Sequence, residues 1–327
     1  MKSRQPALRL LKLAPGRFTL RRFTAILCIQ TTYRQRRRFC LLARMATLSE
    51  ITLYPIKSCA GIALRSATLT RAGLATESVH DREWMLVDGA GNFLSQREHP
   101  RMALIVPHLT AGTLQLSAPG MPPLEIGLGL PDPAAASVLT VQLWGEPVTA
   151  FDCGAASAAW FSGALGTACR LVRFHPGAVR LASDKWCAGV AAPNRFSDGF
   201  PVLLIGTASL ADLNQKLLAA GRAALPMNRF RPNLVIDGMG AFEEDYAAAL
   251  QLGDMQLKPV KPCPRCPIPS VDQATGIAGP DPLDLLRTYR ARAELDGAIC
   301  FGMNCIVIEG EQQHVHVGQE IAVTLAF

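Results

Sequence analysis

Residues 261–276 read KPCPRCPIPSVDQATG, and this stretch decides how the rest of the chain is interpreted. Its first ten residues hold four prolines and the two cysteines Cys263 and Cys266, which predicts a rigid loop rather than a helix or a strand interior. Arg265 stands between the cysteines and would stabilise a thiolate, the form that a metal ligand or a nucleophile needs. We therefore expect a thiolate held at fixed geometry.

The Cys263-x-x-Cys266 pair leaves three kinds of site open. It could be half of a zinc site that Cys300 and Cys305 complete. It could be a redox-active dithiol, although such a motif opens a helix, which the prolines at 267 and 269 oppose. It could also be one metal-ligating thiolate beside a bystander cysteine. Spacing alone does not choose among them.

Outward from this loop the chain reads mostly as short strands separated by turn residues. In the first half we expect a helix at 155–165 and strands at 47–53, 64–70, 84–87, 102–106, 113–116, 139–143 and 148–151. In the second half we expect helices from Leu210 to a stop at Gly221 and at 282–291, and strands at 201–205, 233–236, 255–257, 305–308 and 321–325. Residues 173–196 lose periodicity and indicate a linker or long loop. The predicted class is α+β and β-rich: a string of short strands comes first, and a second domain with a few helices begins near Phe196 and is closest to a barrel or a strongly curled sheet.

The first 44 residues form a basic extension with 12 lysines and arginines and no acidic residue. Removing them from the chain's 33 basic residues leaves 21 against 26 acidic residues, a net charge of −5. Such a segment has the composition of an organellar transit peptide. We favour the alternative that Met45 is the real start, which places the protein in the cytoplasm; a genuine transit peptide would place it in mitochondria.

The body of the chain excludes several classes of protein. Its mildly acidic balance predicts no nucleic-acid partner, and no apolar run reaches the 18 or so residues that span a bilayer. Ten cysteines without a secretory signal or dense spacing indicate a reducing compartment. No glycine-rich phosphate loop of either common spacing is present.

Several motifs together carry a family resemblance from about Ser49 to Leu325. They are Leu53-Tyr54-Pro55-Ile56-Lys57-Ser58-Cys59, Asp81-Arg82-Glu83-Trp84, Phe196-Ser197-Asp198-Gly199, Ser209-Leu210-Ala211-Asp212-Leu213-Asn214, Asn228-Arg229-Phe230-Arg231-Pro232-Asn233, the 261–276 loop and Phe301-Gly302. In order and spacing they resemble the MOSC-domain family with its N-terminal β-barrel domain. Within it, the chain is most similar to the mitochondrial amidoxime-reducing components and their bacterial relatives. The resemblance implies an N-terminal β-barrel-like domain at 45–172, followed by a MOSC β-barrel domain with a few helices at 173–327.

The resemblance implies a molybdenum cofactor whose metal is bound by a pterin dithiolene and by the second cysteine of the pair, Cys266, with Cys263 a bystander. A soft thiolate suits such a metal. The pterin phosphate needs cations and polar donors, and the matching cofactor-binding positions are Lys57, Ser58, Arg82, Asp198, Gly199, Arg231, Asn233, Arg265 and Asp272. On the residues alone Lys57 also fits a solvated surface charge, and Asp272 fits a cap of the Thr275-Gly276 turn.

The same resemblance implies an oxidoreductase that reduces the N–OH group of amidoximes and N-hydroxylated base analogues to N–H, with water as co-product. The sequence shows no four-cysteine iron–sulfur motif after the barrel domain. We therefore expect a separate electron donor, such as a cytochrome b5-like protein, a ferredoxin or a flavin reductase. The family's tyrosine near Phe301-Gly302 is Asn304 in this chain.

Two alternatives remain at this point. MOSC domains also serve as sulfur carriers in cofactor sulfuration through a cysteine persulfide, and the family is associated with pyridoxal-phosphate binding, but no desulfurase domain accompanies this one. The other alternative is a zinc-stabilised binding module that uses Cys263, Cys266, Cys300 and Cys305.

Overall fold

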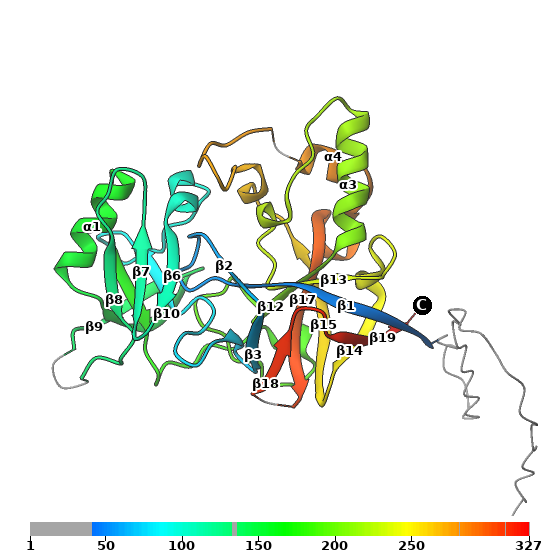
Figure 1. Ribbon diagram of the computed structural model, residues 1–327, viewed down its shortest axis with the longest axis horizontal. Coiled ribbons are helices and arrows are strands. Elements are labelled where there is room, and N and C mark those ends of the chain that lie inside the picture. The colour runs from blue at the N-terminus through cyan, green and yellow to red at the C-terminus, as the bar shows by residue number, and fades with distance from the viewer. Residues whose placement is uncertain (1–40, 133–135, 281, 311, 327) are drawn as a thin grey trace, which may run out of the picture.

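The computed structural model describes residues 41–132, 136–280, 282–310 and 312–326 and consists of two strand-rich lobes (Figure 1). The basic extension lies outside the described residues except for 41–44, which begin the first strand. Within the described residues there are four α-helices, and none is long and apolar enough to cross a membrane. The predicted β-rich α+β class is confirmed.

A closed barrel of seven strands forms one lobe, counted over the described residues. Its order is β12 (Val202–Gly206), β13 (Leu234–Asp237), β1 (Leu41–Leu53), β19 (Glu320–Ala326), β14 (Ala247–Leu252), β15 (Met255–Pro264) and β17 (Ala298–Glu309), with β17 pairing again with β12. Only β12 and β13 run parallel among these pairs. Alternate side chains of these strands fill the interior, as in Leu250, Leu252, Val323 and Leu325.

The first strand ties the two lobes together. Residues 41–47 of β1 pair with β19, and the strand then shifts register between Leu48 and Glu50 along β13. Its far end pairs with β2 (Ile62–Leu64), so the loop at 54–61 lies between the lobes. Arg44 extends the attachment through an ion pair of 3.3 Å with Glu243. Residues 41–53 therefore form one strand of the barrel.

The other lobe is built from small antiparallel sheets. One has the order β5 (Trp84–Val87), β11 (Arg170–Phe174), β10 (Glu146–Asp152), β9 (Val138–Leu143), and a second joins β6 (Val106–Thr110), β7 (Thr113–Ser117) and β8 (Leu124–Gly127). A third sheet, which joins β18 (Gln313–His316), β3 (Ser66–Thr70) and β4 (Gly73–Ala75), lies beside the barrel strands instead (Figure 1). Helix α1 (Ala155–Leu165) covers β11 with Phe161 fully buried, at the residues that the sequence predicts.

Two expected elements differ in the structure. Residues 102–106 are not a strand: Pro100 starts the 3₁₀ helix η1 (Pro100–Leu104), because proline fits the first turn of a helix, and only Val106 belongs to β6. The expected loop from Lys261 begins later, because β15 continues to Pro264. Register shifts at Pro259/Lys261 and Pro262/Pro264 let the strand tolerate its prolines, since bulges leave backbone groups unpaired anyway.

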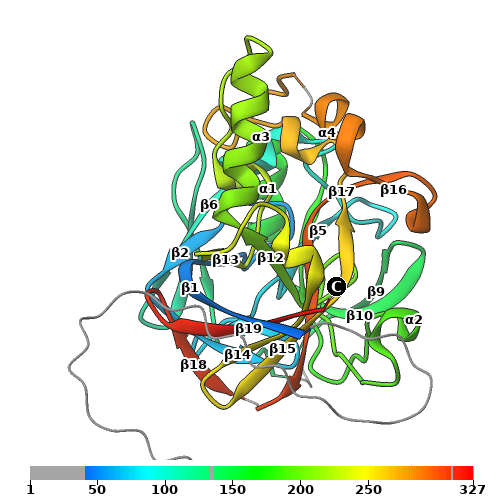
Figure 2. The ribbon, with the colours of Figure 1, turned by 90° about the vertical axis from the view of Figure 1, so that its right-hand side faces the viewer.

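Two of the longer helices lie together on one side of the barrel (Figure 2). Helix α3 (Thr207–Ala219) and helix α4 (Leu283–Arg290) pack over a cluster that includes Ile205, Leu213 and Phe301. The segment after β11 contains the short helix α2 (Asp184–Cys187), and Cys187 packs against Ile306 of the barrel. The expected linker at 173–196 is therefore a packed connection that begins with the end of a strand. The other short elements are β16 (Ala291–Arg292), η2 (Met227–Arg229), η3 (Glu243–Tyr246), η4 (Ile268–Ser270) and η5 (Ala293–Leu295).

Candidate functional site

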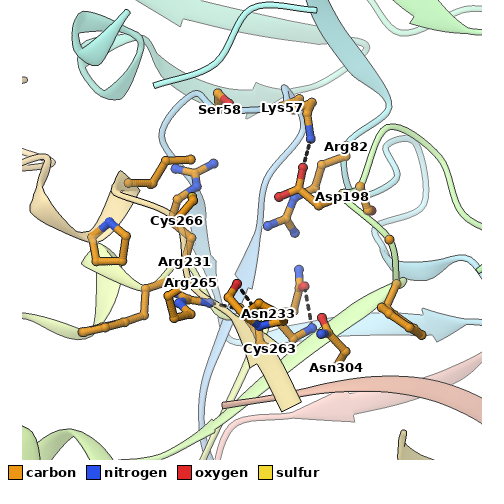
Figure 3. Close-up of a pocket in the computed structure, with 18 residues that line it drawn as sticks. Lys57, Ser58, Arg82, Asp198, Arg231, Asn233, Cys263, Arg265, Cys266 and Asn304 are labelled. Atoms are coloured by element: carbon orange, nitrogen blue, oxygen red, sulfur yellow. Dashed lines mark hydrogen bonds and ion pairs between the residues drawn. The ribbon is translucent and has the colours of Figure 1, made fainter. Parts of the chain in front are cut away.

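A pocket of about 120 Å³ lies between the loops after β1, the loop before β12 and the end of β15 (Figure 3). It is lined by Lys57, Ser58, Arg82, Ser197, Asp198, Gly199, Phe200, Leu203, Phe230, Arg231, Asn233, Cys263, Pro264, Arg265, Cys266, Ile268, Pro269 and Asn304. Nine of the ten site residues expected from the sequence are among them. Residues far apart in the chain thus converge on one cavity.

The two cysteines occupy different positions in this pocket. Cys263 lies near the C-terminal end of strand β15, and its sulfur accepts a hydrogen bond of 3.1 Å from Nη1 of Arg265. The other guanidinium nitrogen of Arg265 donates to the carbonyl oxygen of Phe230. Cys266 lies just beyond the strand, and no hydrogen bond among the described residues involves its sulfur. Of the pair, Cys266 has the sulfur left available to a ligand.

The four cysteines of the zinc alternative do not assemble. Cys300 and Cys305 are buried in β17, and their thiols donate to the carbonyl oxygens of Ala298 and Met303. Burial raises the pKa of Cys300 to about 11, which disfavours the thiolate that zinc requires. Across the described residues no group of three or more His, Cys, Asp or Glu side chains could hold a metal. The zinc hypothesis therefore has no site in this structure.

Two pocket arginines stack on one buried ring. The guanidinium carbons of Arg82 and Arg231 each lie 4.3 Å from the ring centroid of Tyr54. Tyr54 is only 3% exposed, so the buried ring fixes the positions of the two cations that stack on it. Burial, and secondarily the like charge of Arg82, lowers the pKa of Arg231. Bringing two guanidinium groups together at this cost favours an anionic ligand in the pocket that both of them line.

A buried carboxylate holds this arrangement from behind. Asp81 is fully buried; its Oδ1 accepts hydrogen bonds from the backbone nitrogen of Tyr54 at 2.9 Å and from Nδ2 of Asn233 at 3.0 Å, and its Oδ2 pairs with Arg82. Burial raises the pKa of Asp81, and Arg82 opposes that rise. Asn233 Oδ1 in turn accepts a hydrogen bond from the backbone nitrogen of Leu203. The side-chain amide of Asn233, expected as a cofactor contact, is therefore hydrogen-bonded to Asp81 and to the backbone of Leu203.

Backbone strain gathers at the same place. Ser58, Arg82 and Arg231 have φ angles of 65°, 48° and 55°, three of the eight non-glycine residues with positive φ in the described part of the chain. Each such conformation costs on the order of 1 kcal/mol and persists where the surroundings enforce it, commonly at functional sites. A chain of amides supplies part of that enforcement: Gln96 donates to the carbonyl oxygen of Ser58 at 2.7 Å and to Gln273 at 3.2 Å.

The ion pair between Lys57 and Asp198 and the unpartnered hydroxyl of Ser197 line one side of the pocket. Lys57, 5% exposed, pairs with Asp198 on the same side of the pocket (Figure 3). Desolvation lowers the pKa of Lys57, and the Asp198 carboxylate opposes this. Arg180 anchors the loop by donating to the carbonyl oxygens of Ser197 at 2.6 Å and Asp198 at 3.0 Å. The Ser197 hydroxyl is buried in the pocket wall without a partner among the described residues, which marks it as available to a ligand.

One expected cofactor contact lies elsewhere. Asp272 does not line the pocket: its Oδ1 accepts hydrogen bonds from the backbone nitrogens of Ala274 and Thr275, at 2.9 and 3.0 Å, and its Oδ2 pairs with Arg229 at 2.7 Å. The first two bonds lower the pKa of this carboxyl. Its alternative role as a turn cap matches these contacts. By contrast, the sequence predicts no role for Gln96, or for Tyr54, Asp81 and Ser197 within the quoted motifs, because only the tertiary fold brings them to the site.

The donor set fits an anionic, metal-bearing group. Four cations line the pocket, Lys57, Arg82, Arg231 and Arg265, against the one carboxylate of Asp198. Charge-assisted hydrogen bonds from guanidinium groups suit a phosphate, the unpartnered Ser197 hydroxyl offers another polar contact, and the Cys266 sulfur offers a soft metal ligand. A single cysteine leaves the other coordination positions of a metal to the bound group itself.

Comparison with known proteins agrees with this geometry. Residues 45–168 match the model of the MOSC N-terminal beta barrel domain, and residues 191–322 match that of the MOSC domain. Mitochondrial amidoxime reducing component 2 of Rattus norvegicus is 36% identical over 255 residues, 76% of this chain and 74% of the relative. Mitochondrial amidoxime-reducing component 1 of Homo sapiens is 35% identical over 259 residues, 78% and 75% of the two chains.

A third relative has a different name. The molybdenum cofactor sulfurase of Oryza sativa subsp. japonica is 30% identical over 296 residues, which cover 84% of this chain but 35% of that protein. The amidoxime-reducing components are matched over about three quarters of their own length, and both domains of this chain are matched by family models. The chain belongs to the MOSC-domain family, in the group that includes the mitochondrial amidoxime-reducing components.

Proposed function

We propose that this protein is a molybdenum-cofactor-dependent reductase of N-hydroxylated compounds, with amidoximes and N-hydroxylated base analogues as its substrate class. The observation that carries the proposal is the pairing, in one pocket, of the unpartnered Cys266 sulfur with four cations against one carboxylate. The names of the relatives support the reaction class. The alternative job of a sulfur carrier draws support only from the rice relative, most of whose length this chain does not match.

Each wall of the pocket has a distinct task in this proposal. The Cys266 thiolate would hold the metal, and Arg82 and Arg231, both stacked on Tyr54, would bind the pterin phosphate. When bound, the cofactor supplies a metal centre that exchanges two electrons and takes up oxygen from an N–OH group. Lys57 would hold a proton at Nζ near the reacting group while Asp198 keeps that ammonium charged.

Substrate and electrons reach the site from outside the chain. A small N-hydroxylated molecule accepts two electrons and two protons, and its N–O bond breaks to give N–H and water. The described residues contain no cluster of metal ligands that could relay electrons. We therefore propose a separate redox partner of the cytochrome b5, ferredoxin or flavin-reductase type.

The compartment is a separate proposal. The amidoxime-reducing relatives are named as mitochondrial, and residues 1–44 carry 12 basic and no acidic residues. We propose the cytoplasm, with mitochondria as the alternative if the extension acts as a transit peptide. A fluorescent protein fused after residue 44 would accumulate in mitochondria under the alternative and stay diffuse under the proposal.

Reduction of benzamidoxime to benzamidine tests the function. Protein produced in a host that makes the cofactor, supplied with a chemical electron donor, is expected to form benzamidine. Cys266→Ala should abolish the reaction because the metal loses its protein ligand, whereas Cys263→Ala should retain much of it because that sulfur already has a partner in Arg265. Equal loss in both variants would reject the single-ligand assignment, and no turnover by loaded wild-type protein would reject the function.

A further inference from the structure

An exposed tryptophan stands at the tip of the hairpin between β9 and β10. The loop has two residues, Trp144 and Gly145, with φ angles of 56° and 81°, and Leu143 pairs with Glu146. Two positive φ angles define the turn type in which Asn or Gly is strongly preferred at the first position. A tryptophan there works against the local backbone preference, and its side chain is 47% exposed. A large ring placed on the surface at a backbone cost indicates a use for the ring.

The neighbours of Trp144 hold its ring in place. Phe93 packs against it with ring centroids 4.8 Å apart and planes inclined by 54°. The guanidinium carbon of Arg97 lies 4.6 Å from the Trp144 centroid, and Arg97 is itself fixed by a hydrogen bond of 3.1 Å from Nε to the hydroxyl of Ser95. Phe93 and Trp144 therefore form a braced aromatic pair, which we call the aromatic platform.

The platform adjoins the pocket through Lys57. The ammonium nitrogen of Lys57 lies 5.4 Å from the Phe93 centroid and 6.0 Å from the Trp144 centroid, while the same residue lines the pocket and pairs with Asp198. Neither aromatic residue lines the pocket itself. A molecule whose polar end is inside the pocket could therefore extend past Lys57 and place a flat apolar end on the platform.

We propose that Phe93 and Trp144 form a subsite for a planar aromatic group of the substrate, with the N–OH end directed into the pocket. The proposal rests on the reductase function above and adds a preference within its substrate class. An indole face partly open to solvent stacks with flat aromatic rings, and the cations of Lys57 and Arg97 beside it favour electron-rich rings. Aryl amidoximes should therefore bind better than alkyl amidoximes of similar polarity.

Trp144→Asn is the decisive variant. Asn suits the first position of this turn, so the hairpin should fold and the Tm should be unchanged or higher while the ring is gone. We expect the KM for benzamidoxime to rise about tenfold, the upper end of what one aromatic contact supplies, with kcat nearly unchanged. The KM for acetamidoxime should stay the same. Trp144→Phe should retain much of the aryl preference, and Leu218→Asn, at an exposed apolar position of helix α3 outside the pocket lining, should change neither KM.

A binding measurement complements the kinetics. Titration with benzamidine should quench tryptophan fluorescence in the wild-type protein and much less in Trp144→Asn, because Trp84 and Trp160 are buried and the half-buried Trp186 does not line the pocket. An unchanged aryl-to-alkyl KM ratio in Trp144→Asn overturns the proposal, as does loss of molybdenum from that variant, which would assign the platform to the cofactor. Failure of loaded wild-type protein to reduce either amidoxime would instead reject the reductase function.

Discussion

Arg173 lies in the lobe built from small antiparallel sheets, called the N-terminal lobe below, and Arg231 lies in the pocket. Both are buried, at 5% and 8% exposure, and each stacks on an aromatic ring, Trp84 and Tyr54 respectively. Arg173 is completely satisfied: its Nε donates to Glu83 at 2.7 Å, and its other two nitrogens donate to the carbonyl oxygens of Gly129 and Leu128 at 2.8 and 2.9 Å. For Arg231 the side-chain hydrogen bond is a long contact of 3.5 Å with Gln273.

The difference separates a cation that holds the fold from one held for a ligand. Burial of a guanidinium group is costly unless its N–H groups are bonded. In the N-terminal lobe the protein bears that cost with its own acceptors, whereas in the pocket the donors are left for an anion. The predictions below test this distinction, beginning with the largest expected effect.

Replacing Arg173 should damage stability alone. Arg173→Met leaves the buried carboxylate of Glu83 without its ion-pair partner, so the free energy of unfolding should fall by about 3–5 kcal/mol, as measured by denaturant unfolding. Molybdenum per folded chain should stay at the wild-type value. The double variant Glu83→Gln/Arg173→Met serves as the control and should recover part of the loss. A mild effect of Arg173→Met on stability would remove the contrast.

Replacing Arg231 should weaken cofactor binding and leave stability almost unchanged. Arg231→Met removes a buried charge that faces Arg82, so the free energy of unfolding should change by less than about 1 kcal/mol. Cofactor retention should fall by about 10- to 100-fold, the loss expected for a charged hydrogen-bonding partner. Metal and pterin content of purified protein measure it. A variant that unfolds easily but keeps its cofactor would show that Arg231 is structural.

Removing the ring on which both arginines stack should have a smaller effect. Tyr54→Leu keeps an apolar side chain but loses two cation–π contacts, so cofactor retention should fall about tenfold. Tyr54→Phe keeps the ring and should behave like wild type, with the hydroxyl having no part in the spacing. Both variants are compared by molybdenum content at matched protein concentration. Equal retention by the leucine and phenylalanine variants would contradict the role of the ring.

The smallest expected effect is a pH dependence from Lys57. Burial lowers the pKa of Lys57 in the folded protein, so the charged ammonium destabilises the folded state. This destabilisation is complete below the folded pKa and is absent above the ordinary pKa of 10.5. Anion binding through Lys57 should therefore weaken a few-fold as pH rises towards 10.5, before an ordinary lysine would titrate. Phosphate affinity of cofactor-free protein against pH measures this, and Lys57→Arg should bind independently of pH over that range. An identical profile for both proteins would exclude the effect.

Local sequence patterns predict some elements well. Helix α1 and strand β5 occur at the residues expected, because a helical run of alanines with Trp160 and Phe161, and a four-residue apolar run, each carry their own signal. The prolines of 261–264 mislead, since nothing local reveals that β17 accommodates them by register shifts. Likewise, no local pattern reveals that 41–44 pair with β19, at the other end of the chain.

The site divides in the same way. Cations such as Lys57 and Arg82 are identified by motif, and the structure places them in the pocket. The supports are invisible to spacing: Tyr54 looks like a strand residue, Asp81 like a turn residue and Ser197 like a loop serine. Asp272 shows the converse, because the turn contacts that its local sequence indicates are present in the structure and it does not line the pocket.

Metal and pterin analysis of protein from a cofactor-competent host tests the central claim most directly. We predict close to one molybdenum and one pterin per chain in wild type and in Cys263→Ala, and neither in Cys266→Ala. Stoichiometric zinc, or a labile sulfane sulfur on Cys266 without molybdenum, would contradict the account.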